Sequence, residues 1–264
     1  MTKKERADRA VLSRGLAESR EKARALIMAG RVSADGRKVE KPGELLAAGA
    51  TLSVDPGIPF VSRGGLKLAE ALDAFGVEVA GRVAADLGVS TGGFTDCLLQ
   101  RGARLVYAVD VSTRQLDWRL RRDPRVVLVE KNARYLSPGD FPERPDLVTM
   151  DLSFISVLKV LPAVRQLLSD GIVLALLKPQ FEVGKGQVGK RGVVRNPVQH
   201  VEVLDGLLEA ARKLGFGTSG LHGCRVRGQK GNREFFVRWT LKGPSLCPEK
   251  SRELVREVVY EKKD

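Results

Sequence analysis

The sequence has few of the residues that build disulfide frameworks and metal sites. Its 264 residues include 3 cysteines and 2 histidines. Cys97, Cys224 and Cys247 lie far apart, so they predict neither a disulfide framework nor the close ligand spacing of a zinc site. We therefore expect no bound metal and a reducing compartment.

Long apolar runs are also missing. The longest ones, such as residues 172–177, fall far short of the ~20 residues that span a bilayer. The N-terminal residues are charged and contain no apolar stretch, which excludes a secretory signal. These features predict a soluble, cytoplasmic protein without stable membrane association.

Aromatic and acidic residues are in short supply relative to basic ones. Aromatics make up 5% of the chain, and 45 Lys and Arg face 32 Asp and Glu, for a formal net charge of +13. Such a surplus predicts a polyanionic partner, either nucleic acid or an anionic membrane surface. The apolar fraction of 43% is enough for a core and excludes a disordered chain. With so few aromatics, we expect shape readout of a folded RNA more than base stacking.

Residues 1–58 form a small unit with its own pattern. Two helical patterns, at residues 6–14 and 19–29, precede short strand-like pieces, and residues 55–59 are typical of a linker. The order resembles the small α+β alpha-L RNA-binding domain of a ribosomal protein, pseudouridine synthases and tyrosyl-tRNA synthetases. The matching residues are 15–23, 26–32 and 41–43. The alternative is that the basic stripe of Arg20, Arg24 and Arg31 is only a solvated helix face.

From residue 59 to residue 264 the pattern changes to alternating strands and helices. Seven strand-like runs occur at residues 83–87, 105–110, 126–129, 147–151, 172–177, 215–221 and 234–241. The first five are separated by crossover lengths and predict a parallel sheet, whereas the last two predict an antiparallel hairpin. This outline is the seven-strand, Rossmann-like α/β sheet of S-adenosylmethionine-dependent methyltransferases. Residues 248–264 predict a surface helix.

A glycine-rich turn follows the first strand of this sheet. Gly88 and Gly93 occupy the outer positions of the dinucleotide fingerprint, but Ser90 takes the middle one, which weakens a pyrophosphate interpretation. Asp86, before the first glycine, suits a ligand with a cationic amino group. Asp110 closes the next strand, where a carboxylate accepts ribose hydroxyls, and Asn132 follows the third strand and can reach an adenine edge. The alternative for each residue alone is an ordinary cap or turn.

Four ionisable residues define a candidate catalytic site. Asp151 and Lys178 end the fourth and fifth strands, and Glu234 opens the antiparallel seventh, so topology brings all three to one edge of the sheet. Lys67 joins them if its helix packs beside the glycine turn. Two lysines and two carboxylates can assist deprotonation of a hydroxyl nucleophile that attacks a methyl group. The alternative is a surface salt-bridge network.

With these residues the chain resembles the TlyA family, whose members are labelled both hemolysin and ribosomal RNA 2′-O-methyltransferase. The catalytic part is similar to FtsJ/RrmJ ribose methyltransferases, which use a Lys-Asp-Lys-Glu set. The most specific stretches are residues 61–68, 88–96, 151–156, 177–182 and 231–235. Residues 221–227 are more basic than the family pattern.

The resemblance implies that S-adenosylmethionine is the cofactor and that cytidine ribose in ribosomal RNA is the target. It assigns catalysis to Lys67, Asp151, Lys178 and Glu234, with Lys178 as the base. It assigns cofactor binding to Asp86, Gly88, Ser90, Thr91, Gly92, Gly93, Phe94, Asp110 and Asn132.

Basic residues cluster on two glycine-containing segments, at 184–195 and 221–233. Such segments suit phosphate contacts, although solvated surface is the alternative. Together with the N-terminal unit they give the candidate RNA-binding residues Arg20, Arg24, Arg31, Arg63, Lys185, Lys190, Arg191, Arg225, Arg227 and Lys230.

Three other functions compete with ribose methylation. The family label suggests a membrane-active hemolysin, but no spanning segment or strongly apolar amphipathic helix supports it. Residues 151–154 faintly echo the motif of base methyltransferases, but both prolines of that motif are missing. A non-catalytic RNA-binding assembly factor is the third alternative, and the intact acid–base residues count against it.

Overall fold

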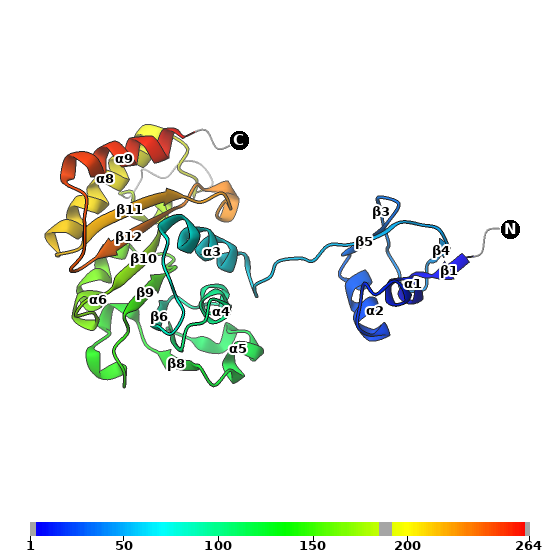
Figure 1. Ribbon diagram of the computed structural model, residues 1–264. Coiled ribbons are helices and arrows are strands. Elements are labelled where there is room, and N and C mark those ends of the chain that lie inside the picture. Colours follow the sequence, from blue (N-terminus) through cyan, green and yellow to red (C-terminus); the bar gives the residue numbers. More distant parts are fainter. Residues whose placement is uncertain (1–3, 185–191, 262–264) are drawn as a thin grey trace. The chain divides into compact units, whose positions relative to one another are not determined.

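The computed structural model describes residues 4–184 and 192–261 (Figure 1). The chain divides into two compact units, Met1–Pro59 and Phe60–Asp264.

The smaller unit packs two helices and short strands around its own apolar core. Helix α1 (Ala7–Ser13) packs on α2 (Arg20–Met28), and the Ser19 side chain accepts a hydrogen bond from the Lys22 N–H at 3.1 Å at the start of α2. Strands β2 (Val32–Ala34), β3 (Arg37–Lys38) and β5 (Leu52–Val54) form a sheet in the order β3–β2–β5. A separate pair joins β1 (Lys4–Arg6) to β4 (Leu45–Ala47).

The larger unit contains a seven-stranded mixed sheet in the order β11–β12–β10–β9–β6–β7–β8. Its strands are β6 (Val83–Leu87), β7 (Leu105–Asp110), β8 (Val126–Glu130), β9 (Leu147–Met150), β10 (Ile172–Leu177), β11 (Gly217–Gly223) and β12 (Phe235–Thr240). Strands β6 to β10 pair in parallel, whereas β12 runs antiparallel to both β10 and β11. The predicted fold class and the C-terminal hairpin are confirmed.

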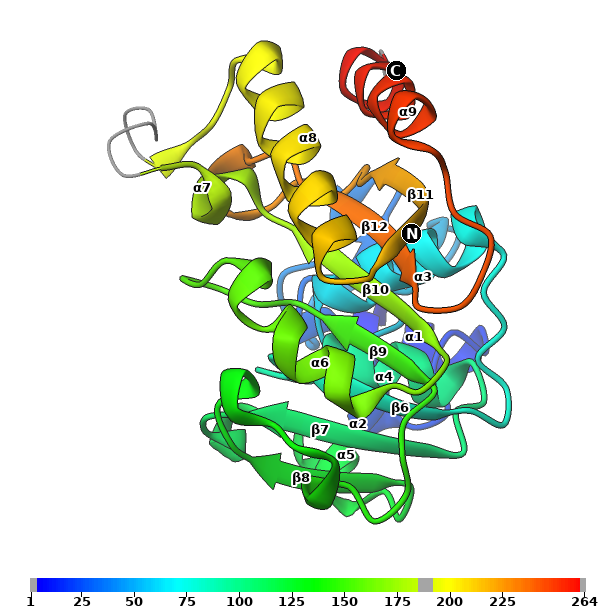
Figure 2. The same cartoon turned by 90° about the vertical axis from the view of Figure 1, so that its left-hand side faces the viewer.

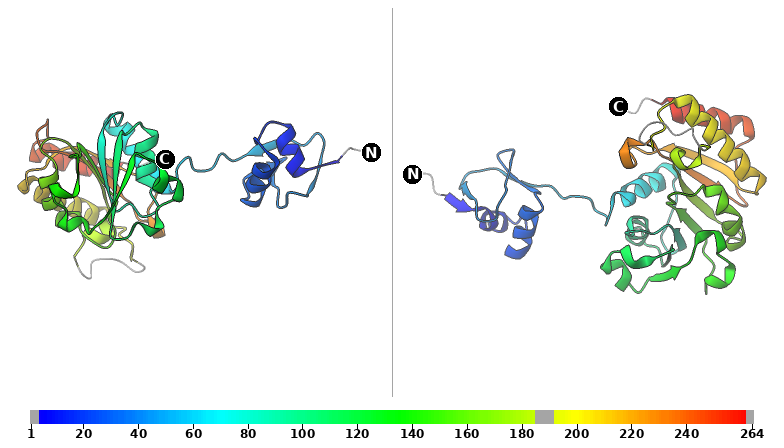
Figure 3. Two further views of the ribbon diagram at one scale, coloured as in Figure 1. Left: turned by 90° about the horizontal axis from the view of Figure 1, so that it is seen from below. Right: turned by 180° about the vertical axis from the view of Figure 1, so that it is seen from behind.

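Helices cover both faces of this sheet because its strands are apolar on both sides. One face packs against α3 (Arg63–Phe75), α4 (Gly93–Gln100) and α5 (Trp118–Arg122). The other packs against α6 (Leu161–Leu167), α8 (Pro197–Lys213) and α9 (Pro248–Tyr260). In Figure 2, α6 lies in front of the strands while α3 and α4 lie behind them, and Figure 3 gives two further views.

Short helices complete the larger unit. Helix α7 (Pro179–Glu182) directly follows β10. The 3₁₀ turns are η1 (Thr113–Gln115), η2 (Ala133–Tyr135), η3 (Pro138–Asp140), η4 (Val157–Lys159) and η6 (Gln229–Gly231). Across residues 4–184 and 192–261, no helix has both the length and the apolarity needed to cross a membrane.

The strand arrangement determines where the polar strand ends meet. The carboxyl ends of the parallel strands β6 to β10 lie along one edge of the sheet, which we call the carboxyl edge. Strand β12 starts at this edge because it is antiparallel and pairs Phe235 with Leu177, the last residue of β10. Residues 178 and 234 are therefore neighbours, although they are far apart in sequence.

Phe236 links β12 to the helix that follows the glycine turn. Its ring is fully buried and stacks on Phe94 of α4 at a centroid distance of 5.7 Å. We expect Phe236→Ala to lower the free energy of unfolding by about 3–5 kcal/mol, because it leaves a void between α4 and the sheet. Denaturant unfolding measures the change. Tyr260→Ala, on the exposed end of α9, is the control and should stay within about 0.5 kcal/mol of the wild type. Equal losses in the two variants would contradict this packing role.

Candidate active site

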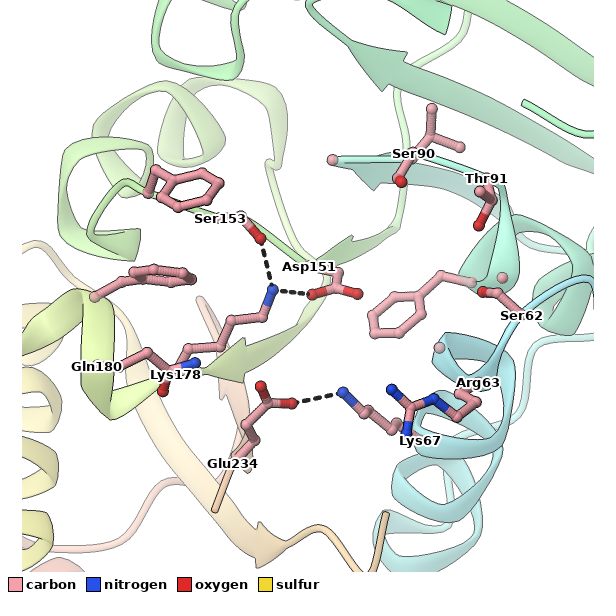
Figure 4. Close-up of a pocket in the computed structure, with 17 residues that line it drawn as sticks. Ser62, Arg63, Lys67, Ser90, Thr91, Asp151, Ser153, Lys178, Gln180 and Glu234 are labelled. Carbon is pink, nitrogen blue, oxygen red and sulfur yellow. Dashed lines mark hydrogen bonds and ion pairs between the residues drawn. The ribbon is translucent and has the colours of Figure 1, made fainter. Parts of the chain in front are cut away.

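A cavity of about 300 Å³ opens at the carboxyl edge of the large sheet (Figure 4). Lys67, Asp151, Lys178 and Glu234 all line it. The glycine turn after β6 forms part of the same wall through Gly88, Ser90, Thr91 and Gly93. The fold thus brings the four ionisable residues from distant parts of the chain to one cavity.

The four side chains form two ion pairs. Lys67 Nζ donates a hydrogen bond to Glu234 Oε2 at 2.6 Å, and both side chains are buried. Lys178 Nζ lies 2.6 Å from Asp151 Oδ1 and donates to Ser153 Oγ at 3.0 Å. Figure 4 shows the two pairs facing the same space. Each ammonium thus has a carboxylate beside it, and this balances the charge of the site.

Each of these residues is positioned by an element boundary or a helix turn. Asp151 follows β9, Lys178 follows β10 at the start of α7, and Glu234 precedes β12. Lys67 lies in the second turn of α3. A side chain at Gly228 would overlap the Glu234 carboxylate, so a glycine there leaves room for the buried pair.

The glycine turn lies tightly between the end of β9 and the start of α3. Gly88 has a φ of +90°, and a Cβ at this position would lie 2.7 Å from the carbonyl oxygen of Asp151. A Cβ at Gly93 would lie 2.9 Å from the backbone nitrogen of Gly65. Both positions need glycine, and the backbone is left open to a ligand.

A second cavity, of about 520 Å³, adjoins the first and shares Gly88, Ser90 and Asp151 with it. Asp110 and Asn132 line this cavity at the ends of β7 and β8. One oxygen of Asp110 accepts the Ser90 N–H at 3.0 Å, which holds the carboxylate beside the turn. A glycine cradle next to a carboxylate and an amide fits a nucleoside cofactor such as S-adenosylmethionine, with the sugar at Asp110 and the base near Asn132.

Asp86 differs from the sequence expectation that it faces a cationic amino group. It is fully buried and lies on the wall of neither cavity. Its carboxylate accepts hydrogen bonds from Thr95 Oγ1 at 2.7 Å and Thr149 Oγ1 at 3.0 Å. Burial raises the pKa of Asp86 to about 7, against the opposing effect of these two hydroxyls. The residue ties α4 to β9 underneath the turn.

The remaining cofactor candidates divide between the cavity wall and the packing behind it. Thr91 and Phe94 line the first cavity. Gly92 does not, and a Cβ there would overlap Leu116 and Leu120 beneath the turn. Its role in the structure is to let the start of α4 pack closely.

The RNA-binding candidates lie in different settings. Arg63 lines the first cavity, and Arg24, Arg225, Arg227 and Lys230 are exposed.

Two other arginine candidates in the smaller unit have internal partners. Arg20 pairs at 3.0 Å with the buried Asp8, whose pKa falls to about 2, chiefly through the Arg6 hydrogen bond and also through Arg20. Arg31 donates to the Asp55 carbonyl at 2.8 Å. Lys185, Lys190 and Arg191 lie outside the described residues.

Sequence reasoning missed several residues of the cavity wall. Ser153, Phe154, Gln180 and Phe181 line it, and all follow Asp151 or Lys178 by two or three positions. Phe154 is 91% exposed, has a φ of +63° and lies 5.1 Å from the Phe181 ring. The sequence signal for these four residues was that they closely follow Asp151 and Lys178, the charged residues directly after β9 and β10.

The fold and the glycine-lined site define an S-adenosylmethionine-dependent methyltransferase. The profile of the FtsJ-like methyltransferases matches residues 60–240, and the S4 domain profile matches residues 5–52.

Known proteins are similar to the chain over most of its length. It is 46% identical over 241 residues to the 16S/23S rRNA (cytidine-2′-O)-methyltransferase TlyA of Mycobacterium tuberculosis strain H37Rv, which covers 90% of each chain. It is 44% identical over 263 residues to a candidate rRNA methyltransferase, YqxC, of Bacillus subtilis strain 168, covering 97% of this chain and 94% of YqxC. A solved structure of a candidate hemolysin from Streptococcus thermophilus matches with a TM-score of 0.73 and 42% identity, covering 98% of this chain and 96% of that one.

The chain belongs to the TlyA family of FtsJ-like methyltransferases. The resemblance inferred from the motifs and the assignment of S-adenosylmethionine as cofactor are confirmed.

Because Gly88 lies so close to the Asp151 carbonyl, we expect one added methyl group at this position to weaken cofactor binding. We expect Gly88→Ala to weaken S-adenosylmethionine binding by at least about tenfold, because its Cβ meets a backbone carbonyl and its left-handed conformation is strained. Calorimetric titration measures the affinity. Gly76→Ala is the matched control: its φ is +58°, but its Cβ would meet nothing within 4 Å. Cofactor affinity that is the same in both variants would exclude a cradle role for Gly88.

The buried carboxyl of Asp86 predicts a specific pH dependence of stability. Between about pH 4 and pH 7, the folded protein keeps a proton on Asp86 that the unfolded chain releases. The free energy of unfolding therefore falls as the pH rises through this window, and the loss is complete above about pH 7. We expect Asp86→Asn to remove this contribution, so the variant loses less stability than the wild type between about pH 5 and pH 8. Urea unfolding across this range is the measurement, and parallel pH profiles would refute the shifted pKa.

Proposed function

We propose that the chain transfers the methyl group of S-adenosylmethionine to the 2′-oxygen of a cytidine ribose in ribosomal RNA. The observation that carries the proposal is the meeting of two lysine–carboxylate pairs at one cavity beside the glycine turn. The named activity of the Mycobacterium tuberculosis relative supports the same reaction and target.

Lys178 is the proposed base. In its neutral form this amino group would accept the proton of the 2′-hydroxyl, and the ribose oxygen would bond to the methyl carbon as the bond from that carbon to the sulfonium sulfur breaks. Asp151, at 2.6 Å, stabilises the ammonium that results, and Ser153 fixes the direction of the Lys178 side chain. A ribose hydroxyl is a poor nucleophile at neutral pH, so both removal of its proton and its positioning are needed.

Lys67 and Glu234 form the more deeply buried pair and are proposed to hold the ribose from the neighbouring wall. Their buried contact keeps the two charges in fixed places. Removing either partner leaves the other charge buried and uncompensated, which is costly. The pair thus supplies orientation, and Lys178 supplies proton transfer.

When bound, S-adenosylmethionine supplies a sulfonium methyl group that is open to attack by a nucleophile. The residues proposed to hold it are the glycine turn, Asp110 and Asn132. Asp86 acts behind them by keeping α4 attached to β9.

The aromatic wall of the cavity supports a nucleotide as the methyl acceptor. Phe154 presents its ring to solvent at the cavity, beside Phe181, and Lys178 Nζ lies 5.9 Å from the centre of the Phe181 ring. We propose that this ring stacks on the base whose ribose enters the site, because an unpaired base offers a flat face of matching size.

RNA capture is assigned to the basic residues outside the cavity. We propose residues 1–58 as the RNA-binding domain and residues 59–264 as the catalytic domain, acting on ribosomal subunits in the cytoplasm. The match of residues 5–52 to the S4 domain supports this division.

The test is methylation of unmodified ribosomal subunits with labelled S-adenosylmethionine, followed by nucleoside analysis. We expect labelled 2′-O-methylcytidine from the wild type, and a loss of at least about 100-fold in rate for Lys178→Ala, at the lower end of general-base contributions. Lys159→Ala, an exposed lysine on η4, is the matched control and should keep full activity. Label on nucleobases alone would overturn the ribose assignment, and leakage of liposomes without any methylation would favour the hemolysin interpretation.

A further inference from the structure

Exposed aromatic side chains are concentrated along one edge of the larger unit. Among the residues that the structure describes, the exposed aromatics are Trp118, Tyr135, Phe154 and Tyr260. The first three come from segments that follow β7, β8 and β9, and Tyr260 ends α9. A chain with 5% aromatics thus leaves three of them exposed in the segments after the strands that hold the cofactor and the catalytic residues.

Trp118 lies beside the glycine turn. The N–H of the preceding residue, Asp117, donates to the Thr91 carbonyl at 3.2 Å. The Trp118 side chain is 64% exposed, and the Arg122 guanidinium lies 5.5 Å from its ring centre. Arg122 forms no ion pair with any described residue, so its charge is available to a ligand.

Tyr135 repeats this arrangement after the next strand. It is 64% exposed, and the Arg134 guanidinium lies 5.6 Å from its ring centre. Asn132, three residues earlier, lines the second cavity. Both aromatic–arginine pairs therefore belong to segments that also form the cofactor site.

We infer that Trp118 and Tyr135, here called the edge aromatics, bind unpaired bases of the RNA substrate next to the target nucleotide. The inference rests on the proposed function and adds a contact surface to it. An aromatic face stacks on any base, and the adjacent guanidinium attracts the phosphate of the same nucleotide. Because stacking needs an exposed base face, the surface selects single-stranded RNA over duplex.

The local composition favours RNA over a lipid surface. In α5, Leu120 is buried in the core, and the exposed residues besides Trp118 are the three arginines 119, 121 and 122. A membrane-bound helix needs a continuous apolar face, which this five-residue helix does not present. Its basic residues instead complement a polyanion that carries stacked bases.

The experiment compares the affinity of full-length variants for a short single-stranded RNA and for a duplex of the same sequence. We expect Trp118→Ala to weaken single-strand binding about 5- to 150-fold, the range of one lost base stack. Trp118→Phe should restore most of the affinity because it keeps a stacking ring. Tyr260→Ala is the matched control with an exposed aromatic on α9, and it should bind as the wild type does.

Each possible result of this experiment either supports or overturns the inference that the edge aromatics bind RNA bases. Unchanged single-strand affinity in Trp118→Ala would overturn the inference, as would an equal loss in Tyr260→Ala or full rescue by Trp118→Leu. Loss of binding to anionic phospholipid vesicles, with RNA binding intact, would assign the surface to membranes. Cofactor affinity is measured on each variant, and a parallel loss there would mean that the substitution disturbs the glycine turn instead. The proposed function is judged separately by wild-type methylation of ribose, so its failure is distinguishable from failure of this inference.

Discussion

The arrangement of the site depends on pairing each lysine with a carboxylate. A lysine or glutamate as buried as Lys67 and Glu234 is stable in the charged form only when its partner lies within hydrogen-bonding distance, as it does at 2.6 Å. That contact requires α3 and the start of β12 to meet. Parallel register does the same for Lys178 and Asp151, because Met150 lies opposite Ala175 and both β9 and β10 end at this edge. Both ion pairs therefore depend on the sheet order that the chain adopts, with β9 parallel and β12 antiparallel to β10.

The glycine turn packs directly against the end of β9, which carries Asp151. Gly88 packs against the Asp151 carbonyl, so the first glycine of the turn and one of the proposed catalytic residues occupy adjoining positions. Beneath them, Asp86 holds hydroxyls from α4 and β9. Burial of Asp86 opposes its ionisation, and this makes the junction sensitive to pH. Asp86, which the sequence predicts as a contact to the cofactor, instead lies behind the turn and joins α4 to β9.

Much of the fold and of the candidate site could be predicted from the sequence, because both depend on the order and direction of the strands. Strands buried on both faces give continuous apolar runs, and parallel connection places Asp151 and Lys178 at one edge whatever the details of packing. The direction in which an individual side chain points could not be predicted from the sequence. Nothing in the sequence shows that the Asp86 carboxylate points away from the cavity or that Arg20 is paired with Asp8. Strands β1 and β4, with three residues each, are too short for any periodicity to be read. Phe154 also combines an exposed ring with a left-handed backbone conformation, and no local sequence pattern predicts either.

The charges proposed to attract the substrate lie outside the cavity, apart from the paired charges proposed to take part in the reaction. Within the cavity, two ammonium groups face two carboxylates, so the four groups nearly cancel and exert little long-range pull on RNA. The net charge of +13 must therefore act through residues outside the cavity. This arrangement has a kinetic consequence, because salt screens exposed charges far more than a buried pair. Rising ionic strength should weaken RNA capture while the rate of the bound complex stays nearly constant. The paired charges are then free to serve the roles proposed for them in orientation and proton transfer, and binding can be changed by substitutions that leave the chemical step intact.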